Sequence, residues 1–422
     1  MASIRKRGNA YQITVSDGRY PDGRKRFVTA TFKPDPQKSD RQNQKALEYF
    51  AADFERSVLA GKNFDGQKMT FAELVEKYKR QYGERRLQEK TLESYDDLLR
   101  YHVIPEIGSL RVAQIQTVHL NDLYDKLYHE RKDDKQGGYG ASTVKRIHGV
   151  VSSVFRYAVK SGIIEASPCD NAILPREEIE APQDAVKSFT VEQTGKFLDY
   201  ITQPYTVTRH PRNRKAYTEI HTVPEQMQIF LKMALLCGCR RSELIALEWS
   251  DVDFDKRELS ITKATVIVKG SLITKATKTK GSNRKISLPP ILASDLKQYH
   301  QHQLEYRLQI GTQWQGKDYL FIQWDGSQMR PETPYKTFKR LIERYNETYP
   351  NEPLPNIPLH GLRHTSATIA ISENKTDIST VSARLGHSRT STTLNIYSHA
   401  LESKDRAAAD AIENLFYPKK KA

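Results

Sequence analysis

The first 66 residues contain hydrophobic patterns of two different periods. Apolar and polar side chains alternate along Tyr11–Val15 and again along Arg26–Phe32, which is the period of a half-buried strand. Asp17-Gly18 and Asp22-Gly23 lie between these runs and supply turn residues for a hairpin. Over residues 41–60 the apolar positions instead recur every three or four residues, as on one face of a helix. We therefore expect a three-stranded sheet backed by one helix over residues 1–66.

Residues 67–175 follow the helical period almost throughout. Thr70 and Glu73 form a capping box at the start of a helix that should run to about Tyr82. Further helical patterns cover Thr91–Val103, Thr117–Tyr128 and Ser142–Ser161. Pro105 and Gly108 should separate the second helix from the third, because proline interrupts a helix. This region predicts an all-helical domain of four or five helices.

The last region, residues 176–422, mixes helices with short strands. Three prolines and an acidic cluster make residues 164–188 an expected interdomain linker, and Thr190 with Gln193 forms a second capping box. Strand patterns follow around Glu258–Val268 and Arg284–Leu288, and helical patterns continue to a tail helix capped by Ser403. The expected fold class is therefore multi-domain α+β, with a small sheet inside a mostly helical third domain.

The charge balance narrows the possible partners. The 422 residues include 66 Lys and Arg against 51 Asp and Glu, which gives a net charge of +15. Such an excess favours nucleic acid over a membrane, and no run approaches the roughly 18 apolar residues of a membrane span. Only three cysteines occur, so we expect a reducing compartment, the cytoplasm, and core packing for Cys237 and Cys239.

Four segments of the third domain contain polar residues that core packing does not require. They hold Arg240 with Glu243, Lys278 in a Lys-rich run, His360 with Arg363, and His387 followed ten residues later by Tyr397. A charge within the apolar sequence around position 240 needs an opposite charge or a bound anion. The run 276–288 is typical of a hairpin with its turn at Gly281-Ser282.

Each of these segments also has a plain structural interpretation. Arg240 and Glu243 could form a surface ion pair, basic turns are common, and a single histidine is more often structural. A metal site at His360, His364, His387 and His399 is disfavoured because no carboxylate or cysteine stands at ligand spacing. Two arginines among these histidines would also repel a cation, so we expect no metal.

Taken together and in this order, the segments resemble the tyrosine recombinases. The motif Gly238–Leu244, then Lys278, then His360-x-x-Arg363, then Leu-Gly-His387 and Tyr397 spans about 160 residues. Residues 1–66 resemble the arm-DNA-binding domain of phage and conjugative-transposon integrases, and residues 67–175 resemble their helical core-binding domain. Residues 176–422 then correspond to the catalytic domain and its C-terminal tail.

The resemblance implies a function and a role for each residue. The chain would be a site-specific recombinase that integrates or excises a mobile element through a 3′-phosphotyrosyl intermediate on Tyr397, without a cofactor. Arg240 and Arg363 would bind the phosphate oxygens, and His360 and His387 would assist. Glu243 would support Arg240 or His360 from behind. Lys278 would protonate the leaving 5′-oxygen, although Lys275 and Lys280 lie in the same run.

Double-stranded DNA is the partner that the basic residues favour, at separate core and arm sites. Residues 1–33 contain eight basic and two acidic side chains. The expected DNA-binding residues are Arg5, Lys6, Arg7, Arg19, Arg24, Lys25, Arg26, Lys145, Arg146 and Arg156. The resemblance further implies a homo-tetramer on two duplexes, with the tail helix docked in cis or in trans, and allows for an accessory excision factor or a host DNA-bending protein.

Two other functions remain compatible with such a fold. One is a catalytically silent DNA-binding regulator, which the complete set of active-site residues disfavours. The other is a type IB topoisomerase, which uses similar chemistry as a monomer. The additional basic sheet domain at the N-terminus favours the integrase.

Overall fold

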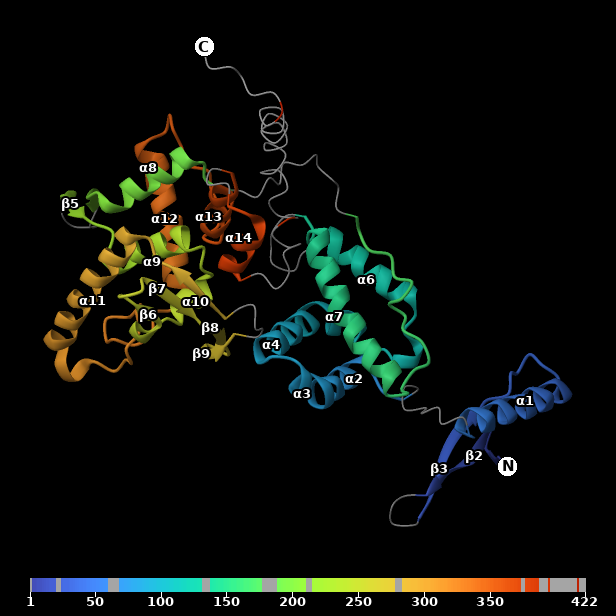
Figure 1. Cartoon of the computed structure of the whole chain (residues 1–422). Coiled ribbons are helices and arrows are strands. Elements are labelled where there is room, and N and C mark those ends of the chain that lie inside the picture. The colour runs from blue at the N-terminus through green and yellow to red at the C-terminus, as the bar shows by residue number, and fades with distance from the viewer. Residues whose placement is uncertain are drawn as a thin grey trace. The chain divides into compact units, whose positions relative to one another are not determined.

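A computed structural model describes most of the chain. The described residues are 2–19, 24–59, 68–130, 137–176, 188–209, 215–277, 283–372 and 376–386, together with Leu394 and Phe416. The chain divides into two compact units, Met1–Ile179 and Glu180–Ala422 (Figure 1).

The N-terminal sheet has the predicted architecture. Its antiparallel strands β1 (Ser3–Arg7), β2 (Ala10–Arg19) and β3 (Lys25–Phe32) follow in that order, and α1 (Asp40–Leu59) covers one face. Ile13 and Val15 of β2 are buried against Leu47, Phe54 and Val58 of α1. Asp17-Gly18 does not form the expected turn: it lies inside β2, where the register with β3 shifts between Ser16 and Arg19. Such a bulge takes up an extra residue without ending the strand.

The helical region of the first unit is built around α7 (Ala141–Lys160). It also contains α2 (Phe71–Tyr78), η2 (Lys79–Gly83), α3 (Glu84–Arg86), α4 (Glu89–Leu98), η3 (Leu99–Val103), α5 (Ile104–Ile107), η4 (Val112–Gln114) and α6 (Thr117–His129). Phe71, Tyr78, Tyr124 and Phe155 are completely buried in its core. The predicted capping box of Thr70 and Glu73 is present.

Two helix ends in this region differ from the sequence-based expectation. The first helix does not end near Tyr82, because the π turn η2 carries the backbone on to Arg86. Pro105 does not end the second helix either, since it lies at the start of α5 directly after the π turn η3. A proline at the first turn of a helix loses no hydrogen bond, and the wider turn before it reduces the clash of its ring with the preceding carbonyls.

The second unit surrounds α9 (Glu225–Leu236), which packs against α8, α10, α11, α12 and α13. The remaining helical elements are α8 (Val191–Thr202), α10 (Arg241–Ile245), η5 (Trp249–Asp251), α11 (Pro290–Ile310), η7 (Gly311–Gln313), α12 (Glu332–Thr348), α13 (Gly361–Ser372) and α14 (Ile378–Leu385). Most of α9 is apolar and buried, as expected of a helix enclosed by others.

Three small sheets complete this unit. β10 (Arg284–Ser287), β7 (Glu258–Ile261) and β6 (Val252–Asp253) form one, β8 (Lys263–Val268) and β9 (Ser271–Ala276) the second, and β4 (Tyr205–Arg209) and β5 (Tyr217–His221) the third. The hairpin expected over residues 276–288 is wrong, because β9 pairs with β8 and β10 pairs with β7. The turn of the actual hairpin is Lys269-Gly270, and the β4–β5 hairpin was not anticipated.

The tail helix expected after Leu401 lies outside the described residues except for Phe416, whose side chain is exposed. Across the described segments, no helix has both the length and the apolar character needed to cross a membrane.

Candidate active site

Arg240 lies at the entrance to helix α10, where the chain turns away from α9. Its side chain is one third exposed, at 33%. Glu243 at the third helical position accepts the Arg240 main-chain N–H at 2.9 Å and the Arg240 Nη1 at 2.8 Å. This capping interaction orients Arg240, and because Glu243 is only 3% exposed the pair is half-buried and is not a solvated surface ion pair.

Arg363 approaches Arg240 from helix α13. It is only 2% exposed, and its Nη1 and Nη2 donate to the carbonyl oxygens of Gly238 and Leu385, each at 2.7 Å. Arg240 donates to the same end of α14, from Nη1 to the Leu385 oxygen at 3.5 Å and from Nη2 to the Gly386 oxygen at 3.2 Å. Burial and then the charge of Arg240 lower the pKa of Arg363 to about 10, so the Arg363 guanidinium is charged at neutral pH.

His360 stands immediately before α13, on the rim of the same region. Its ring is accessible and lies 4.9 Å from the ring of His364, nearly perpendicular to it. Partial desolvation, His364 and the two nearby arginines lower the pKa of His360 to about 4, so its imidazole is neutral at pH 7. A neutral imidazole can accept a proton or a hydrogen bond.

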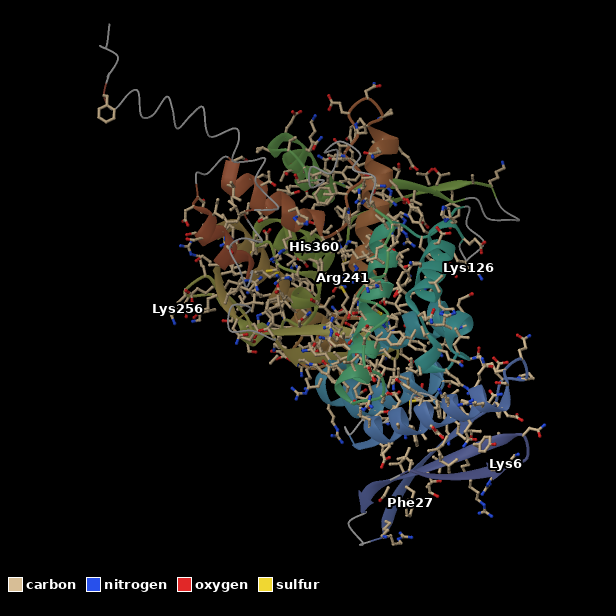
Figure 2. The ribbon with its side chains drawn as sticks, turned by 90° about the vertical axis from the view of Figure 1, so that its right-hand side faces the viewer. Lys6, Phe27, Lys126, Arg241, Lys256 and His360 are labelled. Atoms are coloured by element: carbon tan, nitrogen blue, oxygen red, sulfur yellow. The ribbon has the colours of Figure 1, made fainter. Side chains whose placement is uncertain are left out.

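A hollow of about 370 Å³ adjoins these side chains. Its apolar wall includes Phe230, Ala234 and Leu359, and its polar rim includes Arg240 and His360. Arg241 lines the same hollow as His360, and both residues are labelled in Figure 2. Arg240, Arg241 and the neutral His360 therefore line an open hollow, while the buried Arg363 donates to the same helix end as Arg240; cationic side chains at such a hollow suit a phosphate-containing ligand.

The other predicted catalytic residues belong to the Lys-rich run and to the segment that follows α14. Lys278, Lys280, His387 and Tyr397 lie outside the described residues. Lys275, the third lysine considered, is exposed on β9 opposite Ala264. His387 follows Gly386 directly in the sequence, and Gly386 ends α14 in the left-handed conformation.

The cysteines and histidines form no metal site within the described segments. In that part of the chain, no three His, Cys, Asp or Glu side chains come together where an ion could bind. Cys237 and Cys239 are buried in the core as expected, and burial raises the pKa of Cys237 to about 11 and also that of Cys239. These thiols are therefore packing residues.

Sequence reasoning missed Arg284 of strand β10. This arginine is buried and shares Glu243 with Arg240, so Glu243 forms ion pairs with both arginines. Burial alone would raise the pKa of Glu243, but the hydrogen bonds and charges of Arg284 and Arg240 bring it below its usual value. The sequence contained a signal for this position. Arg284 shares the strand period of the apolar residues Ile286 and Leu288, and side chains two residues apart lie on the same face of a strand, so Arg284 faces inward with them.

The predicted DNA-binding residues of the N-terminal sheet occupy two faces. Arg5 pairs with Gln12 and lies with Arg7 on the face that α1 leaves open, because side chains alternate along β1. Lys6 instead pairs with Tyr11, with its Nζ 5.9 Å from that ring, on the face that carries the core. Arg24 and Lys25 are exposed, whereas the side chains of Arg19 and Arg26 lie outside the described set.

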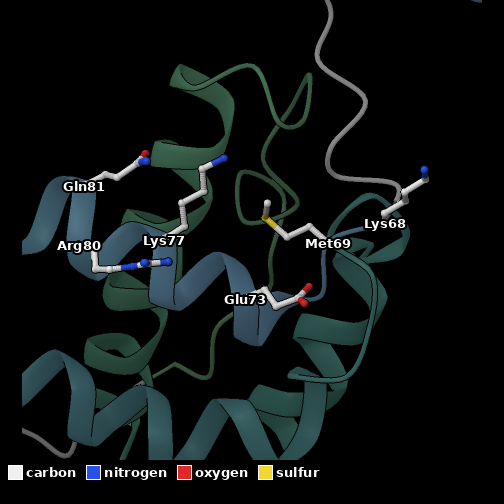
Figure 3. Close-up of a pocket in the computed structure, with 6 residues that line it drawn as sticks. All are labelled: Lys68, Met69, Glu73, Lys77, Arg80 and Gln81. Atoms are coloured by element: carbon white, nitrogen blue, oxygen red, sulfur yellow. The ribbon is translucent and has the colours of Figure 1, made fainter. Parts of the chain in front are cut away.

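Lys145, Arg146 and Arg156 are all exposed on α7. A second basic feature in this region escaped the sequence reading. A hollow of about 570 Å³ is lined by Lys68, Lys77 and Arg80, with Glu73, Met69 and Gln81 (Figure 3). Gln81 accepts a hydrogen bond from Tyr157 of α7, which ties this hollow to the helix that carries the predicted contacts.

The family models and relatives that match this chain are those of integrases and tyrosine recombinases. Residues 212–404 match the phage integrase family, and residues 70–128 match the phage integrase N-terminal SAM-like domain. The chain is 26% identical to a tyrosine recombinase XerC-like protein of Caldanaerobacter subterraneus subsp. tengcongensis, over 96% of each chain. It is 25% identical to the ICEBs1 integrase of Bacillus subtilis, over 81% of this chain and 89% of that one.

Solved structures share the fold. The Tn1549 transposon integrase in complex with transposon right end DNA superimposes with a TM-score of 0.62 at 21% identity, covering 81% of this chain and 99% of that one. A lambda integrase dimer bound to a COC' core site gives a TM-score of 0.51 at 15% identity over 94% of each chain.

Proposed function

Because the chain belongs to the tyrosine recombinase family, we propose that Tyr397 is its nucleophile and that Arg240 and Arg363 bind the reacting phosphate. The chain is a site-specific recombinase that cleaves and rejoins DNA to integrate or excise a mobile element. One observation carries the residue assignment: Arg240 and Arg363 converge on the last carbonyls of α14, one residue before His387. The two arginines, which we call the phosphate clamp, thus donate to the backbone of residues 385 and 386, the latter eleven residues before Tyr397 in the sequence.

The reaction that these residues support is a transesterification. The phenolic oxygen of Tyr397 attacks the phosphorus, the bond to the 5′-oxygen breaks, and a 3′-phosphotyrosyl link forms. Lys278 would protonate the leaving 5′-oxygen. Two guanidiniums match the oxygens on which negative charge develops, so transition-state stabilisation comes from arginine.

The remaining side chains have supporting roles in this proposal. His360 is neutral at pH 7 and can take the proton of the tyrosine hydroxyl. His387 would donate a hydrogen bond to the phosphate, and Glu243 holds Arg240 in place. No step requires a divalent cation, because arginine and lysine supply the positive charge.

The partners follow from the charge and from the related proteins. We propose that core DNA binds the helical domain at residues 67–175 and the catalytic domain at 176–422, and that arm DNA binds residues 1–66 through the open sheet face. A homo-tetramer would join two duplexes in the cytoplasm; a lambda integrase tetramer bound to a Holliday junction is among the structures similar to this chain. An accessory excision factor or a host DNA-bending protein would complete the complex.

The nucleophile assignment is tested with Tyr397→Phe on a nicked core-site substrate that traps the covalent intermediate. This variant should bind DNA normally but form no protein–DNA adduct on a denaturing gel. The matched control is Tyr349→Phe, which removes an exposed hydroxyl elsewhere in the unit. An adduct formed by Tyr397→Phe contradicts the assignment.

The same substrates separate the alternative functions. A silent DNA-binding regulator would form no adduct even as wild type. A type IB topoisomerase would form the adduct but would not exchange strands in a two-site recombination assay.

A further inference from the structure

Arg284 is a buried arginine directly behind Arg240. Its side chain is 6% exposed and that of Glu243 is 3% exposed. Arg284 donates from Nη1 to Oε1 of Glu243 at 3.1 Å and from Nη2 to Oε2 at 2.8 Å, so the guanidinium and the carboxylate meet as two parallel forks. This arrangement is the strongest and most directional that an arginine makes with a carboxylate.

Arg284 also holds the end of helix α14. Its Nε donates to the carbonyl oxygen of Arg384 at 2.7 Å. A Cβ built on Gly386 would lie 2.9 Å from Arg284 Nη1, so the backbone at this glycine rests against the guanidinium. All three nitrogens of Arg284 therefore contact either Glu243 or the helix end that precedes His387.

The position of Arg284 in the sequence adds a third connection. It is the first residue of β10, directly after the segment that contains Lys278 and Lys280. Arg284 thus contacts both the carboxylate that supports Arg240 and the helix end that precedes His387, and it follows the candidate lysines in the sequence.

We propose that Arg284 is a positioning residue for DNA cleavage, which keeps Arg240 available to the phosphate by engaging Glu243 and the end of α14. The inference rests on the proposed function. Arg284 acts through Glu243 and the end of α14, because its Nε and both Nη atoms already donate to these protein acceptors.

The charges explain why this position needs a second cation. Arg240, Arg284 and Arg363 surround one carboxylate, which leaves a net charge of +2 for an incoming phosphate. Without Arg284, Glu243 would have Arg240 as its only direct ion-pair partner among the described side chains. The carboxylate would then compete with the phosphate for the same guanidinium.

The test compares Arg284→Met, Arg284→Lys and the control Lys285→Met in the full chain. Lys285 is the exposed neighbour on β10, in a surface ion pair with Glu258. Each variant is measured for core-site binding and for single-turnover cleavage of a nicked substrate between pH 5 and 8. We expect Arg284→Met to bind normally and cleave about 100-fold more slowly, whereas Lys285→Met matches wild type.

The pH profile distinguishes positioning from simple structural support. In Arg284→Met, Glu243 loses two donors and should protonate at a higher pH, so cleavage should fall further on the acid side. Among the described residues, the other charged or titratable groups that face Glu243 are Arg240, Arg363, His360 and Cys239. Adding Glu243→Gln to Arg284→Met should remove the new acid limb, and Arg284→Lys should restore the wild-type profile in part.

Wild-type cleavage by Arg284→Met overturns the inference. If that variant does not fold, Arg284→Lys decides: normal binding with a wild-type rate overturns it, and normal binding with slow cleavage supports it. An acid limb that persists when Glu243→Gln is added also overturns it. Failure of the proposed function is recognised separately, because wild type would then form no adduct at all.

Discussion

Replacing Gly386 by alanine tests how tightly the end of α14 is packed on the active site. Gly386 has φ of +69°, a conformation that costs a residue with a Cβ about 1–2 kcal/mol. The new Cβ would also lie 2.9 Å from Nη1, 3.1 Å from Cδ and 3.2 Å from Cζ of Arg284. These atoms cannot move freely, because Glu243 and the Arg384 carbonyl hold the guanidinium.

The expected loss of stability is therefore the sum of two effects. Backbone strain contributes about 1–2 kcal/mol, and displacing one buried, charge-assisted hydrogen bond of Arg284 adds about 1–2 kcal/mol. Gly270→Ala is the matched control, since Gly270 has φ of +80° but no atom within 4 Å of its added Cβ. It should show the backbone cost alone.

Intrinsic fluorescence isolates the relevant unit. The three tryptophans, Trp249, Trp314 and Trp324, all belong to the unit Glu180–Ala422, so urea unfolding followed by their emission reports on that unit. Gly386→Ala should lower the unfolding free energy by about 1–2 kcal/mol more than Gly270→Ala and should slow cleavage. Equal losses in the two variants, with cleavage unchanged in Gly386→Ala, would refute the proposed packing of Arg284 on this turn.

Three further predictions concern charge. Replacing Arg240 or Arg363 by lysine keeps the charge but removes the planar fork. Adduct formation should therefore fall by orders of magnitude while DNA binding persists, and EDTA should have no effect. Near-normal cleavage by both lysine variants would contradict the proposed phosphate clamp. The pKa of His360 is lowered from 6.5 to about 4, so the unfolded chain binds more protons between these values and stability should fall as the pH drops from 6.5 to 4. His360→Gln should flatten this decline in the urea midpoint, though only in part because the pKa of His364 is lowered as well. Replacing Arg5 and Arg7 together by alanine should weaken arm-site binding and reduce by about 2 the slope of the logarithm of affinity against the logarithm of salt concentration. Lys6→Ala, on the other face of the sheet, should change this slope less. Equal effects of the two changes would contradict the assignment of faces.

Local signals in the sequence were sufficient for most helices. Both predicted capping boxes, Thr70 with Glu73 and Thr190 with Gln193, form as expected, because their hydrogen bonds join residues only three apart. The apolar face of α7 likewise followed from its period, and Val144, Ile147 and Val151 are buried. Such features depend on neighbouring residues and therefore appear in a single sequence.

Features that depend on distant residues were not predictable in the same way. The π turns at 79–83 and 99–103 each insert a residue into a helix whose apolar period continues beyond them. The pairing of β10 with β7 was missed because Gly281-Ser282 is a stronger turn signal than Lys269-Gly270. Strand register is decided by which faces the core buries, and a local turn motif does not report on that.

In the candidate site, too, the residue types were predictable from the sequence but their arrangement was not. The polar side chains of the motifs were identified from their chemistry, but their acceptors at the end of α14 are main-chain carbonyls, which any sequence has. Arg240, Arg284 and Arg363 donate to the carbonyls of residues 384–386, where the helix ends with partial negative charge. These contacts orient the arginines before any substrate arrives and so reduce the reorganisation needed in the reaction.

The same helix end also lies close in the sequence to the proposed nucleophile, Tyr397. Each guanidinium has five N–H donors, so Arg240 and Arg363 can hold the end of α14 and still offer donors to a phosphate. A lysine ammonium has only three donors and directs them less precisely. His387 follows Gly386 directly and Tyr397 follows it by eleven residues. A displacement of α14 would therefore move the acceptors of all three arginines and the start of the nucleophile segment together. A contact that shifts the end of α14 would thus act on the carbonyl acceptors of all three arginines at once.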